Sequence, residues 1–241
     1  MYAKSNRFEL PSDENLKIWK YMDLSKLVSI LSRRQLYFTR PDQFEDSWEG
    51  SYPKANMEEF ASDQEVPLST HREINKYMRA AIGVNCWHMN ENESAAMWKL
   101  YLKSDEGIAI QSTLGRLKES LVGLEIVYMG LVEYENYDEA RFPRGDRYIP
   151  FFRKRKSFAH EQELRAVFRL TSPSRPLTVN EAANHFPKGM YHDVDTAVLI
   201  ENIYTSPTMQ SWCFESIKAV VKALDDKWEI KKSKLTDEAL F

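Results

Sequence analysis

The first forty residues show two hydrophobic spacings in turn. Leu16 to Met22 alternates with a period of two, which is typical of a half-buried strand. Asp23 then supplies an N-cap oxygen, and the apolar residues of Leu24 to Leu31 recur at spacings of three and four, which predicts a short helix. Gln35 to Thr39 predicts a second strand, which Pro41 ends.

The rest of the chain mixes the two spacings in the same way. Further strands are predicted at 82–88, 107–111, 124–134, 163–170, 189–195, 198–204 and 228–234, and helices at 55–62, 69–79, 93–102, 114–121 and 206–224. The strand at 124–134 is expected to break near Gly130, and those at 189–195 and 198–204 are expected to be adjacent.

The domain organisation follows from this mixing. Strands and helices alternate without glycine-rich linkers or repeats, which predicts a single α+β domain over residues 1–241, with a mixed, mostly antiparallel sheet and flanking helices. The one break in composition is a Ser-Pro-Ser-Arg-Pro stretch, so a subdomain boundary would fall near 171–176.

Charge and cysteine content narrow the functional classes. The chain has 33 Lys plus Arg and 36 Asp plus Glu, and a net charge of -3 removes the whole-chain argument for binding nucleic acid or an anionic membrane. No apolar run approaches the roughly 20 residues of a membrane helix. Cys86 and Cys213 lie far apart in apolar segments, so we expect buried thiols in a reducing cytoplasm.

Most familiar catalytic motifs are absent from the sequence. The 8 glycines form no phosphate-binding loop, and no His-Glu-x-x-His or Gly-x-Ser-x-Gly motif occurs. His185, His192 and Asp193 match no common metal-ligand spacing. The sequence therefore predicts no metal site, and function must come from local groups of side chains.

The first such group is Glu161-Gln162-Glu163-Leu164-Arg165. Strand alternation would place Glu161, Glu163 and Arg165 on one face. Two neighbouring carboxylates and a guanidinium push carboxyl pKa values apart, which suits one carboxylate to act as a base and the other as a charge stabiliser. The alternative is a solvated strand face with a local ion pair.

Two further candidate groups are rich in aromatic residues. A loop combines Arg40, Asp46 and Glu49 with large aromatic residues, which either line a pocket or anchor the loop to the core. Trp87 lies at the end of the strand predicted at 82–88, and Trp98 and Tyr101 share one face of the next helix. The second set either belongs to the core or stacks on a flat ring.

A cationic segment with interleaved phenylalanine and tyrosine completes the candidates. Its basic residues are Arg141, Arg144, Arg147, Arg153, Lys154, Arg155 and Lys156. Basic and aromatic side chains together suit contact with a phosphate and a base. The overall acidity favours a single phosphorylated small molecule over a large nucleic-acid surface.

These stretches in this order resemble the prokaryotic domain-of-unknown-function family 2971 (DUF2971). The resemblance rests on Trp19-Lys20-Tyr21, Leu36-Tyr37-Phe38, Phe44 to Glu49, Met97 to Tyr101, and Lys154 or Lys156 followed by Glu161, Glu163 and Arg165. Trp19 and Ser47-Trp48 depart from the family pattern. The family implies no activity.

A weaker resemblance does imply one. The early strand and helix and the late Glu-x-Glu are similar to the mono-ADP-ribosyltransferase layout, which implies NAD as substrate. On that layout Lys20, with Tyr21 beside it, would grip NAD, Glu163 would stabilise the oxocarbenium ion, and Glu161 would position the acceptor. Lys20 lacks the bidentate fork that an arginine brings to this role.

The sequence thus predicts a cytoplasmic enzyme that cleaves NAD and passes ADP-ribose to protein, nucleic acid or water. Glu161 and Glu163 are the expected catalytic residues, and the expected binding residues are Lys20, Tyr21, Arg40, Asp46, Glu49, Trp87, Trp98, Tyr101, Lys156 and Arg165. One alternative is a non-catalytic interaction module of a prokaryotic defence or toxin system. Another is a nucleic-acid-processing protein with metal-binding carboxylates at Asp46, Glu49, Glu161 and Glu163.

Overall fold

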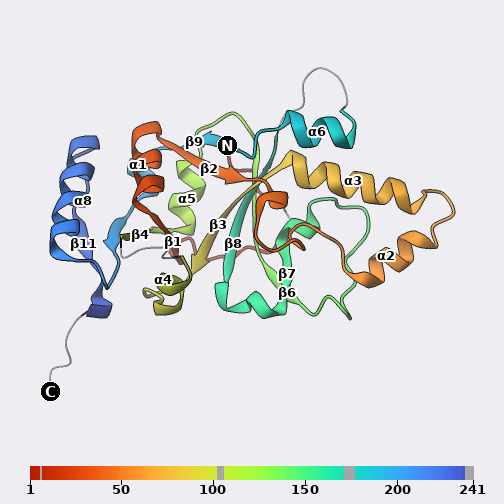
Figure 1. Ribbon diagram of the computed structural model, residues 1–241, viewed down its shortest axis with the longest axis horizontal. Helices are drawn as coiled ribbons and strands as arrows, with labels where there is room; N and C mark the ends of the chain where they lie inside the picture. Colours follow the sequence, from red (N-terminus) through yellow and green to blue (C-terminus); the bar gives the residue numbers. More distant parts are fainter. Residues whose placement is uncertain (6, 102–105, 171–176, 237–241) are drawn as a thin grey trace.

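A computed structural model describes residues 1–241 apart from 6, 102–105, 171–176 and 237–241, so the predicted boundary near 171–176 lies outside the described residues (Figure 1). The strands are β1 (Lys17–Asp23), β2 (Gln35–Thr39), β3 (Ile82–Met89), β4 (Gly107–Thr113), β5 (Val127–Leu131), β6 (Glu133–Glu135), β7 (Arg153–Arg155), β8 (Glu163–Arg169), β9 (Gly189–Asp193), β10 (Asn202–Thr205) and β11 (Ile230–Lys232). The α-helices are α1 (Leu24–Arg33), α2 (Lys54–Ala61), α3 (Leu68–Ala81), α4 (Ala95–Tyr101), α5 (Leu114–Ser120), α6 (Val179–His185), α7 (Thr196–Leu199) and α8 (Ser211–Leu224). Four short 3-10 helices are η1 (Pro41–Gln43), η2 (Ile149–Phe152), η3 (Lys156–Glu161) and η4 (Lys234–Thr236).

Nine of the strands form one sheet. Seven follow the order β11-β10-β4-β1-β3-β2-β9, and β8 pairs with both β3 and β5. All pairs in this sheet are antiparallel except β10 with β11, which confirms the predicted α+β class with a mixed, mostly antiparallel sheet. The strands β6 and β7 form a separate two-stranded parallel sheet. None of the helices within the described ranges is both long and apolar enough to cross a membrane.

The sheet divides at β3. Along one edge β3 pairs with β8 from Ile82 to His88. Along the other edge, Val84 pairs with β2, whereas His88 and Met89 pair with β1. The strands β1 and β2 therefore separate beside Asn85, whose side-chain amide donates to the Tyr37 carbonyl of β2.

The two faces of the sheet have different coverings. One face carries the largest apolar core, in which α1, α5 and α8 contribute Leu27, Leu117 and Ile217. The other face carries two smaller apolar clusters, one under α3 and η2 and one under α4. Figure 1 shows α2 and α3 at one end of the molecule and α8 at the other. Polar side chains on the second face are therefore buried between two apolar clusters.

Several predicted boundaries hold for identifiable reasons. The Asp23 carboxylate accepts from the Lys26 amide and caps α1, as the sequence predicts. The predicted break near Gly130 falls at Val132, between β5 and β6, and β5 itself runs through Gly130. A Cβ at Gly130 would lie 2.7 Å from Cβ of Phe8, so glycine is needed there for close packing.

The prediction for 198–204 is wrong in part. Asp195 accepts from the amides of Ala197 and Val198 and starts the short helix α7, so the strand begins only at Asn202. The strands β9 and β10 are not neighbours, because β9 pairs with β2 and β10 pairs with β4 and β11. The last long helix begins at Ser211 rather than at Ser206.

Candidate functional site

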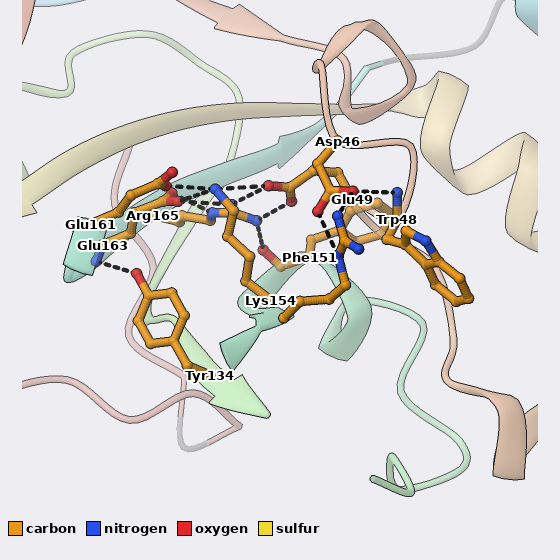
Figure 2. Close-up of polar contacts among 10 residues, drawn as sticks. Asp46, Trp48, Glu49, Tyr134, Phe151, Lys154, Glu161, Glu163 and Arg165 are labelled. Atoms are coloured by element: carbon orange, nitrogen blue, oxygen red, sulfur yellow. Dashed lines mark hydrogen bonds and ion pairs between the residues drawn. The ribbon is translucent and has the colours of Figure 1, made fainter. Parts of the chain in front are cut away.

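Five charged side chains from four segments meet on the second face of the sheet (Figure 2). Glu49 follows η1, Lys154 lies in β7, Glu161 ends η3, and Glu163 and Arg165 lie in β8. We call this group the ion cluster. All five side chains are at most 12% exposed, so this is a buried site and the expectation of a solvated strand face is wrong.

Arg165 is the centre of the ion cluster and is 1% exposed. Its two terminal nitrogens donate to the two oxygens of Glu49, each at 2.9 Å. Its Nε donates to Glu163 at 2.8 Å, and Nη1 also donates to the Phe151 carbonyl. This bidentate geometry fixes the guanidinium, and through it Glu163, in one orientation.

Lys154 joins all three carboxylates. Its Nζ lies 3.1 Å from Glu49, 2.5 Å from Glu161 and 2.8 Å from Glu163. An ammonium is a compact charge with three donors, so it can serve three acceptors at once. Alternation in β7 turns Lys154 inward between Arg153 and Arg155, which are both more exposed.

The two glutamates of the Glu-x-Glu motif ionise differently. Burial, a hydrogen bond to Glu163 and the charge of Glu163 together raise the pKa of Glu161 to about 7. Burial opposes ionisation of Glu163, but Arg165, the hydrogen bond from Glu161 and Lys154 hold the pKa of Glu163 well below its usual range. One carboxyl is therefore fixed as an anion while its neighbour exchanges a proton near neutral pH.

Residues of β3 and β6 support the pair. The backbone amide of Glu163 donates to the hydroxyl of Tyr134 at 2.8 Å. Nδ1 of His88 lies 2.6 Å from the Glu161 carbonyl, so this nitrogen carries the proton of the ring. Burial lowers the pKa of His88, which keeps the ring neutral. The backbone on both sides of Gln162 is thus held by side chains from neighbouring strands.

An aromatic group adjoins the ion cluster. Trp98 is buried and packs edge-on against Tyr21 at 4.9 Å, and Tyr21 lies 6.2 Å from the His88 ring. Tyr101 is 44% exposed as a whole, but its hydroxyl is buried near Cys86, Glu161 and Glu163, and this burial and the neighbouring groups raise the pKa of the hydroxyl. Of the predicted aromatic residues, Tyr101 therefore lies near the carboxylate pair, whereas Tyr21 is linked to it through His88 and Trp98 through Tyr21.

A second ion pair lies next to the loop. Asp46 accepts two hydrogen bonds from Arg155, and the Asp46 carboxylate also accepts from the Trp48 amide. Phe158 packs beneath two cations, with Lys154 Nζ at 4.6 Å and the Arg155 guanidinium carbon at 5.4 Å from the ring centre. Lys156 is exposed at the start of η3.

Three predicted binding residues lie elsewhere. Lys20 alternates with Trp19 and Tyr21 and so lies on the opposite face, where its Nζ donates to Asn85 and to the Cys86 carbonyl in the gap between β1 and β2. Trp87 is buried on that same opposite face. Arg40 is held by Asp42 and by the Phe186 carbonyl.

Three residues of this region are not among the binding residues predicted from the sequence. Lys154 is grouped there with its basic neighbours, His88 stands out only as a neighbour of Cys86 and Trp87, and Tyr134 has no distinguishing pattern. Alternation in the short stretch 153–155 could have separated Lys154 from Arg153 and Arg155. The alternative of a metal site built from carboxylates is not favoured, because Lys154 and Arg165 already pair with the carboxylates of the ion cluster. Within the described ranges, no group of three or more His, Cys, Asp or Glu side chains is placed to hold a metal ion.

Comparisons with known proteins add one likeness. No family model matches the chain, so membership of family 2971 is not shown, and no curated protein matches it. Among solved structures, the chain is similar to "Thermus sp. 2.9 DarT in complex with ADP-ribosylated ssDNA", with 11% identity and a TM-score of 0.39 over 92% of this chain and 94% of that one. At that TM-score the likeness supports no conclusion about function, so the functional argument rests on the ion cluster.

Proposed function

We propose that the protein is an enzyme that cleaves the N-glycosidic bond of NAD or a related nucleotide, with Glu161 and Glu163 as the catalytic pair. The observation that carries the proposal is the pair itself. Two hydrogen-bonded carboxyls share Lys154, and one stays ionised while the pKa of the other, Glu161, is raised to about 7. Sites for acid and base chemistry at neutral pH are built in this way.

The roles of the two carboxyls follow from their surroundings. Glu163 is 4% exposed and its oxygens accept from Lys154 and Arg165, so it serves as a fixed negative charge. Glu161 is 12% exposed and has the pKa of a working base. The geometry therefore favours Glu161 as the residue that contacts the reacting groups.

The proposed reaction balances without a further reagent. The C–N bond to nicotinamide breaks, and its electron pair leaves with the ring, which becomes neutral. Positive charge develops on the ribose, near which the net negative ion cluster is favourable. A protein, nucleic-acid or water acceptor forms the new bond to the ribose carbon, and its proton passes to the ionised Glu161.

Nicotinamide release from NAD tests the proposal directly. Glu161→Gln should lower the rate by about 100-fold or more, the range found on removing a general base. Glu58→Gln removes an exposed carboxylate on α2 and serves as the control, which should leave the rate unchanged. Equal release by wild type and Glu161→Gln would remove Glu161 from the mechanism. Failure of the wild type to release nicotinamide would favour a non-catalytic interaction module.

A further inference from the structure

The two glutamates of the catalytic pair are held in place to different degrees. Glu163 lies in β8, whose backbone pairs with β3, and its carboxylate accepts from both Lys154 and Arg165. Glu161 ends η3, outside the strand, and Lys154 is the one cation with which its carboxylate pairs within the described residues. The distance between the two carboxyls therefore depends on the backbone that joins Glu161 to Glu163.

That backbone turns at Gln162, which has a left-handed φ of 42°. Left-handed backbone is unfavourable for a residue with a side chain, so such a turn needs neighbours that hold it. Two groups of β3 hold this one: the Gln162 carbonyl accepts from the Met89 amide at 2.9 Å, and the Glu161 carbonyl lies 2.6 Å from Nδ1 of His88. The contact from His88 is the one that bears on Glu161 itself.

Packing and that one hydrogen bond set the orientation of the His88 ring. His88 is 5% exposed, its ring centre lies 6.2 Å from that of Tyr21, and Tyr21 in turn packs against Trp98 of α4. Within the described residues, Nε2 of His88 is buried and has no hydrogen-bond partner. The ring therefore makes a single polar contact in the described structure, through Nδ1.

We propose that His88 is a positioning residue of the catalytic pair, which holds the carboxyl of Glu161 against that of Glu163 through the bond from Nδ1 to the Glu161 backbone carbonyl. This inference rests on the proposed function. A neutral imidazole has one N–H, and a carbonyl can only accept, so the contact assigns the proton to Nδ1. Without this donor the Glu161 carbonyl would lose its partner, and the turn at Gln162 would relax and move the Glu161 carboxyl away from its neighbour.

Two substitutions of the same shape separate the hydrogen bond from the packing. Asparagine and leucine both branch at Cγ, but only asparagine presents an N–H close to the position of Nδ1. His88→Leu should lower kcat for nicotinamide release by about 100-fold, because a displacement of about 1 Å at a reacting group can cost this much. The KM for NAD should change by less than about threefold, since the bond of His88 is to the protein backbone and not to the substrate. His88→Asn should keep kcat within about threefold of the wild-type value.

The titration of Glu161 gives a readout that a loss of stability alone would not move. Burial and the contact with Glu163 raise the pKa of Glu161, so release of the turn in His88→Leu should lower this pKa towards the ordinary glutamate value of about 4.3. His88→Asn should keep the wild-type midpoint, and so should the control His160→Asn, which changes an exposed histidine of η3. Carbon-13 NMR of the carboxyl groups measures these midpoints, and thermal melts check that each variant is folded.

Nitrogen-15 NMR of the His88 ring tests the inference in the wild type, even if His88→Leu does not fold. At about pH 7.5, above the ordinary histidine pKa of about 6.5, Nδ1 should be protonated and Nε2 should not. The reverse tautomer would overturn the inference, as would an equal kcat in His88→Leu and His88→Asn, or a Glu161 midpoint that His88→Leu leaves unchanged. Each of these results leaves the proposed function standing, whereas wild-type protein that releases no nicotinamide would overturn the proposed function itself.

Discussion

The two faces of β3 and β8 carry opposite kinds of side chain on the same two strands. Trp87 and Leu164 point into the large apolar core, where both are buried. The neighbouring Glu163 and Arg165 point into the ion cluster and are also buried, and Cys86 beside them is partly exposed. Burial alone therefore does not distinguish the faces, but their energetics differ.

The apolar face is stabilised by the removal of hydrocarbon from water. The charged face gives up the hydration of five ionic groups and regains stability only through pairing and hydrogen bonds. Replacing a buried ion cluster by well-packed apolar residues often leaves the free energy of unfolding unchanged or raises it. Burial of the ion cluster is therefore weak evidence that its role is to stabilise the fold. The comparison teaches that the removal of hydrocarbon from water does not explain the ion cluster, and the proposed catalytic role is our explanation for it.

The largest effect should come from removing the central cation. Arg165→Met leaves Glu49 and Glu163 buried without their main partner and should lower the free energy of unfolding by about 3–5 kcal/mol. Urea denaturation measures this change. Adding Glu49→Met to Arg165→Met removes one orphaned charge and should recover part of the loss, whereas additive losses would contradict a paired cluster.

The second-largest effect should be a pH dependence of the free energy of unfolding that comes from the charged face alone. Glu161 binds a proton more tightly in the folded protein, where its pKa is about 7, than in the unfolded chain, where it is about 4.3. Its contribution to stability therefore falls as pH rises through this window. Relative to wild type, Glu161→Gln should gain about 2.5 kcal/mol between pH 5 and pH 8.

Denaturation curves at both pH values check this, with two controls. Leu164→Ala on the apolar face should cost about 2–5 kcal/mol at either pH, because it removes only hydrocarbon. Glu58→Gln on the exposed side of α2 should show no pH-dependent gain. A gain for Glu161→Gln that is the same at both pH values would argue against a shifted pKa.

The smallest effect concerns the support of the pair. Tyr134→Phe leaves the Glu163 amide without its acceptor and should cost about 0.5–1.5 kcal/mol. Because the hydroxyl orients the backbone at Glu163 rather than reacting, nicotinamide release should fall by less than tenfold. A loss of 100-fold or more with unchanged stability would instead place Tyr134 among the reacting groups.

Much of the fold was predictable because long amphipathic stretches determine their own secondary structure. The strand at Gln35–Thr39 and the helix after Asp23 occur where the spacing predicts them. The run around Val198 was misjudged because a short apolar segment has the same pattern in a buried helical turn as in a strand. The cap at Asp195 decided between them.

The site was only half predictable. Glu163 and Arg165 share a face through strand alternation, as predicted, but Glu161 does not belong to the strand. It ends η3, and Gln162 turns the chain with a φ of 42° before β8 begins. Lys154 was missed because its place between three carboxylates depends on how β7 and β8 are brought together, which no local pattern records.

The proposed catalytic pair requires that Glu161 exchanges its proton near neutral pH while Glu163 stays ionised. Carbon-13 NMR of the glutamate carboxyl groups measures this, with the Glu161 signal identified by its absence from Glu161→Gln. We expect a titration midpoint of about 7 for Glu161. A midpoint near the ordinary glutamate value of about 4.3 would contradict it.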